Sequence, residues 1–251
     1  MQKRGTDPKL VRAATAEQLV TLSSVVALEL VKGLSKVPFA QVQGWLSNKS
    51  FPQKAARKLA QELKAEVSQH DPRLVREQQF LASLGITVDI TGLTISELPR
   101  GFNQIAINPV GQLTKEKLFE FCSKKFLSWK YYDDLDKATA KEQARPKTTY
   151  VFGYRGDTEP DKEHLGKSYD VAMAEGLTFL TVEERIWAEL RYFANTGRYL
   201  DEVGGTITSS LTSGGDAFYA RWNPDDRKFR VRGSHRSYAN PVCGPREAVF
   251  A

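Results

Sequence analysis

Residues that could hold a metal or carry redox chemistry are scarce in this chain. Its 251 residues include two cysteines, Cys122 and Cys243, and three histidines, His70, His164 and His235. Two cysteines so far apart argue against a disulfide framework and indicate a reducing compartment. Because the cysteines and histidines are spread over separate regions, we expect no zinc site, no other metal and no cofactor.

Long hydrophobic runs are also missing. No run approaches the roughly 18 apolar residues that a membrane helix needs. The first residues, 1–7, lack the apolar core of a secretory signal. We therefore expect a protein that does not enter the membrane and that resides in the cytoplasm or on a virion.

The sequence motifs of common enzymes are absent too. The glycine pairs at 204–205 and 214–215 are not followed by the lysine of a phosphate-binding loop, and there is no Gly-x-Ser-x-Gly elbow. The paired aspartates 133–134 and 225–226 stand in turn-like contexts, where aspartate is common. We expect that the protein is not an enzyme.

What is present divides the chain into three regions within an α+β fold. Residues 1–75 form a predicted helical domain, with helices over 15–33, 39–46 and 53–67, and with Pro72 ending the unit. Residues 76–147 form a small α/β domain or linker region. It contains a helix over 76–85, strands over 86–90, 104–108 and 128–132, and a charged linker or boundary over 137–147.

Two helices of the chain carry clear capping signals. The first spans 114–126, where Thr114 is the cap and Leu118, Phe119, Cys122 and Phe126 form the buried side, so that Cys122 is expected in the core. The second spans 182–195 in the third region, 148–251. Thr181 and Glu184 form its capping box, and Gly197 follows its end.

Short strands are predicted around the second helix, over 148–154, 206–210, 218–222, 228–232 and 248–251. From residue 213 onward, apolar side chains alternate with Arg, Tyr, Asn, Ser, His and Asp. Tyrosine and arginine dominate binding hot spots, and Ser and Asn supply adaptable hydrogen bonds. The tail therefore has the composition of a recognition surface.

Positive charge supports an alternative function. The formal net charge is +6 and the pI is about 9.2. Residues 35–63 could form a helix-turn-helix in which Gln53, Lys54, Arg57, Lys58 and Gln61 face phosphates and bases. Nucleic-acid binding by these basic N-terminal helices is the alternative to ligand recognition by the tail.

The C-terminal region resembles a known family. The segments TTYVFGYRG, LTVEERIWAELRYFANTGRYLD, GTITSSLTSGGDAFYARW and FRVRGSHRSYANPVCGPREAVF are similar to the variable proteins of diversity-generating retroelements, in particular those of archaeal viruses, nanoarchaea and uncultivated bacteria. The stretch from LASLGITVDITGL to KFLSWKYYDDLDKA is similar to a domain that often precedes them.

The resemblance implies a C-type lectin fold over 148–251, in the variant shared with formylglycine-generating enzymes, and a variable ligand-binding region over about 206–251. In this family a retroelement rewrites adenines, often in AAC or AAT codons. Such codons cannot become Trp, Lys or Glu, so Trp222, Lys228 and Glu247 are expected scaffold of the site. The expected variable positions are Asp216, Phe218, Tyr219, Arg221, Asn223, Arg230, Arg232, Ser234, His235, Arg236, Ser237, Tyr238 and Asn240.

One departure bears on the remaining alternative. Formylglycine-generating enzymes use a reactive cysteine pair near the C-terminus, whereas only Cys243 lies in that part of this chain. Oxidase activity is therefore in doubt, and the calcium sites of true lectins have no visible acidic cluster here. We expect a non-enzymatic protein that binds a macromolecular ligand, a protein rather than a nucleic acid, with its oligomeric state open.

Overall fold

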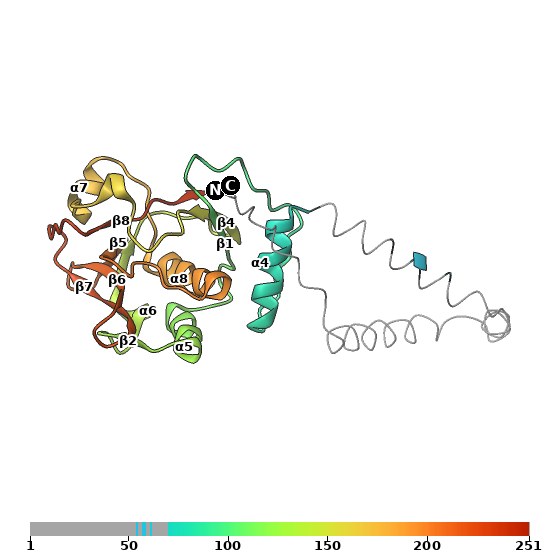
Figure 1. Cartoon of the computed structure of the whole chain (residues 1–251), viewed down its shortest axis with the longest axis horizontal. Coiled ribbons are helices and arrows are strands. Elements are labelled where there is room, and N and C mark those ends of the chain that lie inside the picture. The colour runs from blue at the N-terminus through green and yellow to red at the C-terminus, as the bar shows by residue number, and fades with distance from the viewer. Residues whose placement is uncertain (1–53, 55–56, 59–60, 62–69, 251) are drawn as a thin grey trace, which may run out of the picture. The chain divides into compact units, whose positions relative to one another are not determined.

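The computed structural model describes residues 54, 57, 58, 61 and 70–250, and the chain divides into two compact units, Met1–Glu66 and Val67–Ala251. The helices predicted over 15–33 and 39–46 lie outside the described residues. Of the third predicted helix, Lys54, Arg57, Lys58 and Gln61 are described, and all four are helical and exposed. Figure 1 shows the helices and strands of the second unit.

Helix α4 (Pro72–Ser83) begins where the sequence predicted a helical region to end. Pro72 occupies the first turn, where its missing N–H costs nothing. Asp71 is the cap, because its carboxylate accepts the backbone N–H of Arg73 at 2.8 Å. That Pro72 ends the N-terminal helical region stays a prediction, because residues 62–69 lie outside the described residues; an Asp-Pro pair is also a helix start signal.

The segment 86–90 is not a strand, although its alternation predicted one. Its apolar side chains Ile86, Val88 and Ile90 are buried, as the pattern requires. Its backbone, however, runs beside no other strand, and the carbonyl of Val88 accepts the side-chain amide of Gln78 at 2.8 Å. Alternation thus predicted which side chains are buried but not the backbone pairing.

A three-stranded antiparallel sheet has the order β1 (Gln104–Asn108), β4 (Tyr150–Tyr154) and β9 (Val249–Phe250). Every residue of the central strand β4 is buried. The strands predicted at 104–108, 148–154 and 248–251 are confirmed in β1, β4 and β9. Because β9 pairs with β4, the last described residues of the chain lie beside a strand that comes much earlier in the sequence.

The larger sheet has the order β2 (Ser128–Lys130), β7 (Lys228–Ser234), β6 (Ala217–Asn223), β5 (Gly205–Thr212) and β3 (Thr139–Glu142). Strand β2 runs parallel to β7, the remaining neighbours are antiparallel, and β8 (Cys243–Pro245) pairs with β5 in parallel. The predicted tail strands are confirmed as β5, β6 and β7. Residues 137–147, interpreted as a linker, instead contain β3, which extends this sheet.

Helices α5 (Lys115–Lys125) and α8 (Val182–Thr196) lie side by side (Figure 1) and cover one face of the larger sheet. Both start as their caps predicted: Thr114 accepts the N–H of Lys117, and Thr181 and Glu184 form a reciprocal capping box. Gly197 ends α8 in the left-handed conformation, with φ of 69°.

The main core lies between these helices and the sheet. The ring of Phe229 meets Phe119 of α5 and Phe126, which follows α5, at centroid distances of 6.2 and 6.1 Å. Cys122 is completely buried there, and burial raises the pKa of its thiol, so its predicted core role is confirmed. Other fully buried members come from α8 and β4, namely Ile186, Leu190, Phe152 and Tyr154.

A second, smaller core lies on the opposite face of the larger sheet. It joins Ile207, Tyr219 and Cys243 to side chains from α7 (Tyr169–Ala174) and its flanks, Tyr169 and Phe179. The remaining short helices are α6 (Leu135–Ala138) and the 3-10 turn η1 (Lys162–His164). The second unit is thus a mixed α and β structure in which both faces of the sheet are covered near β5.

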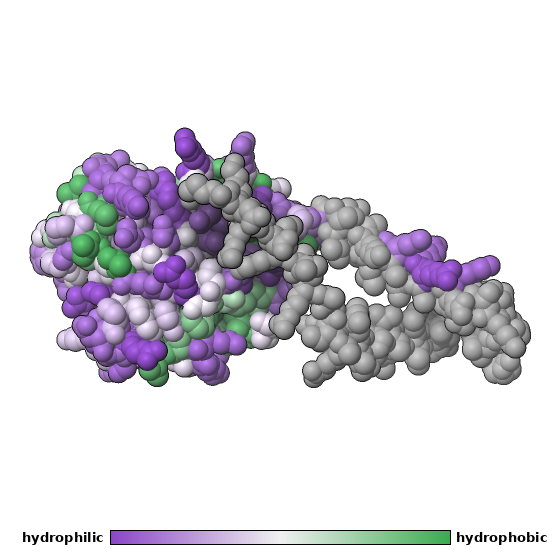
Figure 2. Space-filling model, viewed as in Figure 1, coloured by the Kyte–Doolittle hydropathy of each residue, from purple (hydrophilic) through white to green (hydrophobic). Residues whose placement is uncertain are grey.

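The visible surface of the second unit is mainly hydrophilic, with small hydrophobic patches (Figure 2). Among the described residues, none of the helices has the length and apolar character required to cross a membrane.

Candidate recognition surface

The strands β6 and β7 present two chemically different faces. Phe218, Ala220, Phe229 and Val231 point to the main core and are buried. The alternate residues Arg221, Arg230 and Arg232 point the other way, because successive side chains of a strand lie on opposite faces. The same two strands therefore supply both the core and a cationic outer face.

The outer face is organised by strand register. Arg221 of β6 lies opposite Arg230 of β7, and Trp129 of β2 lies opposite Arg230 on the other side. The guanidinium of Arg230 is 5.6 Å from the ring centroid of Trp129, a cation–π contact. We call the set Arg221, Arg230, Arg232, Trp129 and Tyr131 the arginine face.

The charges of the arginine face are only partly compensated. Arg230 forms an ion pair with Asp226, which also accepts the side-chain amide of Asn223. These two interactions lower the pKa of Asp226. Within residues 70–250, neither Arg221 nor Arg232 forms an ion pair with a carboxylate. The Arg221 Nε donates to the carbonyl of Trp222, and Arg232 lies 5.3 Å over the ring of Tyr219.

Two aromatic side chains complete the arginine face. Trp129 is 39% exposed and Tyr131 is 68% exposed, and their rings meet edge to face at 6.3 Å. Exposed aromatics beside arginines are the side chains that most often carry binding energy at protein interfaces. The sequence analysis assigned residues 128–132 to a strand but did not place Trp129 and Tyr131 in the site. Trp129 and Tyr131 stand on either side of Lys130, so the alternation of a strand would have placed both rings on the same face.

The loop after β7 supplies most of the other predicted positions. His235 Nδ1 lies 2.7 Å from the hydroxyl of Ser237, and the side-chain amide of Asn240 donates to the hydroxyl of Tyr238 at 2.8 Å. Arg236 pairs with Asp170 of α7. The loop side chains hold one another in place while remaining largely open to solvent. The exposed members of the predicted set are Arg232, His235, Arg236, Ser237 and Tyr238, and the half-buried ones are Asp216, Arg221, Arg230, Ser234 and Asn240.

Three predicted surface positions are buried. Phe218 is completely inaccessible because it faces the main core, where it contacts Tyr132 edge to face. Asn223 is 8% exposed because its amide is bonded to Asp226 within the β6–β7 turn. These two side chains hold the sheet and the turn and are not available to a ligand.

Tyr219, the third, is buried in the second core. Its hydroxyl lies 3.4 Å from Cys243 Sγ, and burial raises the pKa of its phenol. A Cβ on Gly205 would lie 2.2 Å from this hydroxyl, so the glycine makes room for it. Codon arithmetic alone could not separate Tyr219 from its exposed neighbours, because a codon says nothing about burial.

The three expected scaffold residues have different environments. Trp222 is half-buried, and its ring stacks on Tyr199 at 3.5 Å with an angle of 8°. Lys228 is half-buried and lies 4.0 Å from Asp226. Glu247 donates its backbone N–H to Asp161 and pairs with Arg155 through its carboxylate. Each of them contacts another fixed part of the unit.

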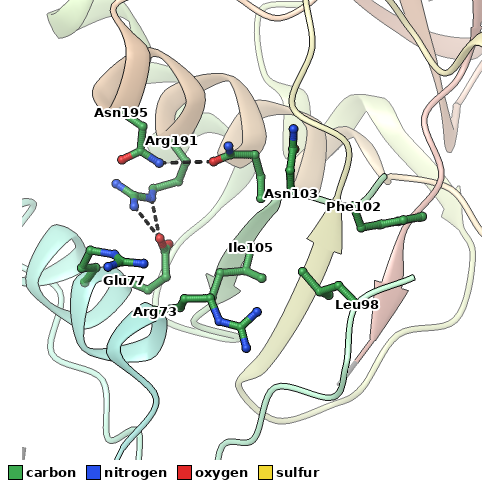
Figure 3. A pocket seen from close by; sticks show the side chains of 10 residues that line it. Arg73, Glu77, Leu98, Phe102, Asn103, Ile105, Arg191 and Asn195 are labelled. Carbon is green, nitrogen blue, oxygen red and sulfur yellow. Dashed lines mark hydrogen bonds and ion pairs between the residues drawn. The ribbon is translucent and has the colours of Figure 1, made fainter. Parts of the chain in front are cut away.

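A separate concavity lies between α4, β1 and α8 (Figure 3). Its volume is about 180 Å³. Arg191 and Glu77 form a buried ion pair on one side of it, while Leu98 and Phe102 stand on the other. Arg73 is paired with Asp71. Two of the three arginines that line the cavity are thus paired with carboxylates, and no exposed aromatic pair accompanies the third, Arg76.

Comparisons with protein-family models, with curated proteins and with solved structures gave no match to this chain.

Proposed function

We propose that this is a non-enzymatic recognition protein whose arginine face and adjoining loop, residues 235–240, bind a macromolecular ligand, a protein. The observation that carries the proposal is the division of β6 and β7. The residues that hold the core lie on one face, while two arginines without a carboxylate partner among residues 70–250 and two exposed aromatics lie on the other.

This division between core and surface side chains suits a protein whose surface residues vary from one copy to another. Exposed substitutions away from special features usually alter stability by less than about 0.5 kcal/mol. Arg232 and the loop residues 235–238 are exposed and could vary without affecting packing. We propose that this domain has a C-type lectin fold of the formylglycine-generating-enzyme variant. We further propose that a retroelement diversifies its tail by adenine-directed mutagenesis, as the sequence resemblance implies.

The side chains of the arginine face indicate the kind of ligand surface that it binds. Unpaired guanidinium groups favour carboxylates, with which they form bidentate hydrogen bonds, and the exposed rings favour an apolar or cationic side chain at the edge. In this copy of the protein, the arginines select an acidic patch on the partner. Other copies would carry other residues at these positions and select other partners.

Sequencing the region that encodes residues 206–251 in many cells of the source population tests diversification. We expect amino-acid replacements concentrated at Arg232, His235, Arg236, Ser237 and Tyr238, and none at Trp222 or Phe229. A near-repeat of this DNA, differing at adenines, should lie nearby with a reverse transcriptase gene. Replacements spread evenly along the region, with no such repeat, would contradict the proposal.

A specific observation also favours nucleic-acid binding by the first unit. Lys54, Arg57, Lys58 and Gln61 are helical, exposed and spaced at i, i+3, i+4 and i+7, which places them on one side of a helix. Phosphate contacts by such a row would make DNA binding fall steeply with salt. The triple variant Lys54→Gln/Arg57→Gln/Lys58→Gln should then lose DNA retention, while the control Lys124→Gln/Lys125→Gln, on exposed lysines of α5, should not. Equal retention by both variants would exclude this function.

A further inference from the structure

A buried group of metal-ligating side chains lies away from the arginine face. Asp161 precedes the turn η1, His164 ends it, and Glu247 follows β8. Each of the three offers one ligand atom, and these atoms all lie within 4.8 Å of one another. The contact between His164 Nε2 and Glu247 Oε2 spans 3.7 Å. Two segments more than eighty residues apart in sequence therefore converge on one point.

Three polar atoms at this point form no hydrogen bond. His164 is only 8% exposed, and neither of its ring nitrogens forms a hydrogen bond. Asp161 is 3% exposed, and its Oδ1 is likewise without a hydrogen-bond partner. Leaving a buried polar group without a hydrogen-bond partner destabilises a folded protein. The His164 imidazole is thus buried, faces carboxylates and forms no hydrogen bond. A bound cation would give its free nitrogen a partner.

The surrounding charges leave a negative excess. Arg155 pairs with Asp161, Glu163 and Glu247, whereas Arg246 lies between Asp161 and Asp201. Arg185 connects Asp201 to Glu189. With the Glu189 carboxyl counted as protonated, four carboxylates face three guanidinium groups, so the network keeps a net negative charge that a bound cation would offset.

We propose that Asp161, His164 and Glu247 bind a divalent transition-metal ion, with Zn²⁺ the best match to one imidazole nitrogen and two carboxylate oxygens. Arg155 lies 2.6 Å from Asp161 Oδ2 and 3.2 Å from Glu247 Oε2. It thus holds one oxygen of each carboxylate, as outer partners of metal ligands commonly do. No metal site was expected from the sequence, because its cysteines and histidines are spread over separate regions.

The ion would fasten the segment 155–166 to the end of the variable tail. The backbone contacts there are already close, since Gly166 N–H donates to the Cys243 carbonyl at 2.8 Å. A Cβ on Gly244 would lie 2.3 Å from the carbonyl oxygen of His164. The loop 235–242 leads directly into β8, so the metal would anchor one end of that loop without touching its exposed side chains.

Calorimetric titration of the full chain, freed of metal with a chelator, with ZnCl₂, MnCl₂ and CaCl₂ tests the proposal. We expect one Zn²⁺ per chain. We also expect His164→Gln to weaken Zn²⁺ binding by at least about tenfold, the effect that even an outer partner's loss produces. The matched control is His235→Gln, which alters an exposed histidine and should leave Zn²⁺ affinity unchanged.

A second readout covers the case in which His164→Gln does not fold. Co²⁺ added to the wild type should give paramagnetically shifted imidazole resonances in the proton NMR spectrum, and folded Glu247→Gln should lose them. The proposal is overturned if the wild type binds no Zn²⁺, if folded His164→Gln binds it as tightly as the wild type, or if His235→Gln is the variant that loses it.

Discussion

At the scale of single residues, neighbours along β6 and β7 differ in what they do. Phe229 is inaccessible and contacts two other aromatic rings, whereas Arg232, three positions later, is exposed and has no ion-pair partner within residues 70–250. The core depends on the first kind of residue, and the proposed recognition depends on the second. Substitutions at the two positions should therefore have opposite effects on folding and on binding.

Phe229→Ala should lower the free energy of unfolding by about 3–5 kcal/mol, because it leaves a cavity among the rings of α5. Arg232→Ser should change the free energy of unfolding by no more than about 0.5 kcal/mol. Urea denaturation followed by tryptophan fluorescence measures both. The assignment of core and surface fails if Arg232→Ser is the more destabilising change.

The buried carboxyl of Glu189 gives a pH dependence. Burial first, and then the negative charge of Asp201, raise its pKa from 4.5 to about 7, against the opposing effect of Arg185. The charged and titratable groups that face it are Arg185, Asp201, Cys122 and Tyr199. Because the folded state favours the protonated carboxyl, its contribution to stability is complete below the unfolded pKa and is lost as pH rises through the folded pKa.

Unfolding free energy should therefore decrease between about pH 4.5 and about pH 7, by up to about 3 kcal/mol from this group. Glu189→Gln cannot titrate and should have a smaller decrease over the same interval, whatever its stability at any one pH. Urea denaturation at the two pH values gives the slopes. Equal slopes for the wild type and for Glu189→Gln would show that Glu189 is ionised throughout.

At the scale of helices and strands, capping residues in the sequence predicted where helices begin and end. The capping box of α8 joins Thr181 Oγ1 to the N–H of Glu184 at 3.1 Å and the Glu184 carboxylate to the N–H of Thr181 at 2.8 Å. Thr181→Ala should cost about 0.5–2 kcal/mol of unfolding free energy. Thr181→Ser retains the hydroxyl and should cost much less, which thermal unfolding of the two variants can show. A Thr181→Ser variant as unstable as Thr181→Ala would mean that the methyl group, and not the cap, matters.

Elements that depend on distant partners were harder to predict. The alternation of residues 86–90 predicted burial correctly, but no other strand runs beside them, so the predicted strand is absent. Conversely, the charged stretch that contains β3 looks like a linker, and only its pairing with β5 makes it a strand. Local composition cannot reveal such pairing, because the partner strand lies about seventy residues away.

The candidate site was predictable to a similar extent. Tail composition pointed to the region, and strand alternation was enough to place Arg230 and Arg232 on one face of β7. Arg221 of β6 joins that face only through the register between the two strands. Trp129 was missed because it comes from β2, which joins the face only through its parallel pairing with β7. Tyr219 was misplaced because the second core, which buries it, is built from α7 and β8.

At the scale of the whole second unit, a sheet with a helix-covered face carries the arginine face, our proposed recognition surface, on its other side. The main core is formed by α5, α8 and the inward residues of β6 and β7, whereas the outer face is closed only near β5, by the second core. Fold and recognition are thus supplied by different side chains of the same strands. This separation is the central claim of the account.

A display library most directly tests that claim. Arg221, Arg230, Arg232, His235, Arg236 and Tyr238 are randomised together on the surface of yeast, and the folded fraction is measured by resistance to protease. A matched library randomises Phe218, Tyr219, Asn223, Phe229, Val231 and Trp222. We predict that most members of the first library remain folded and that most members of the second do not. Equal loss of folding in the two libraries would contradict the account.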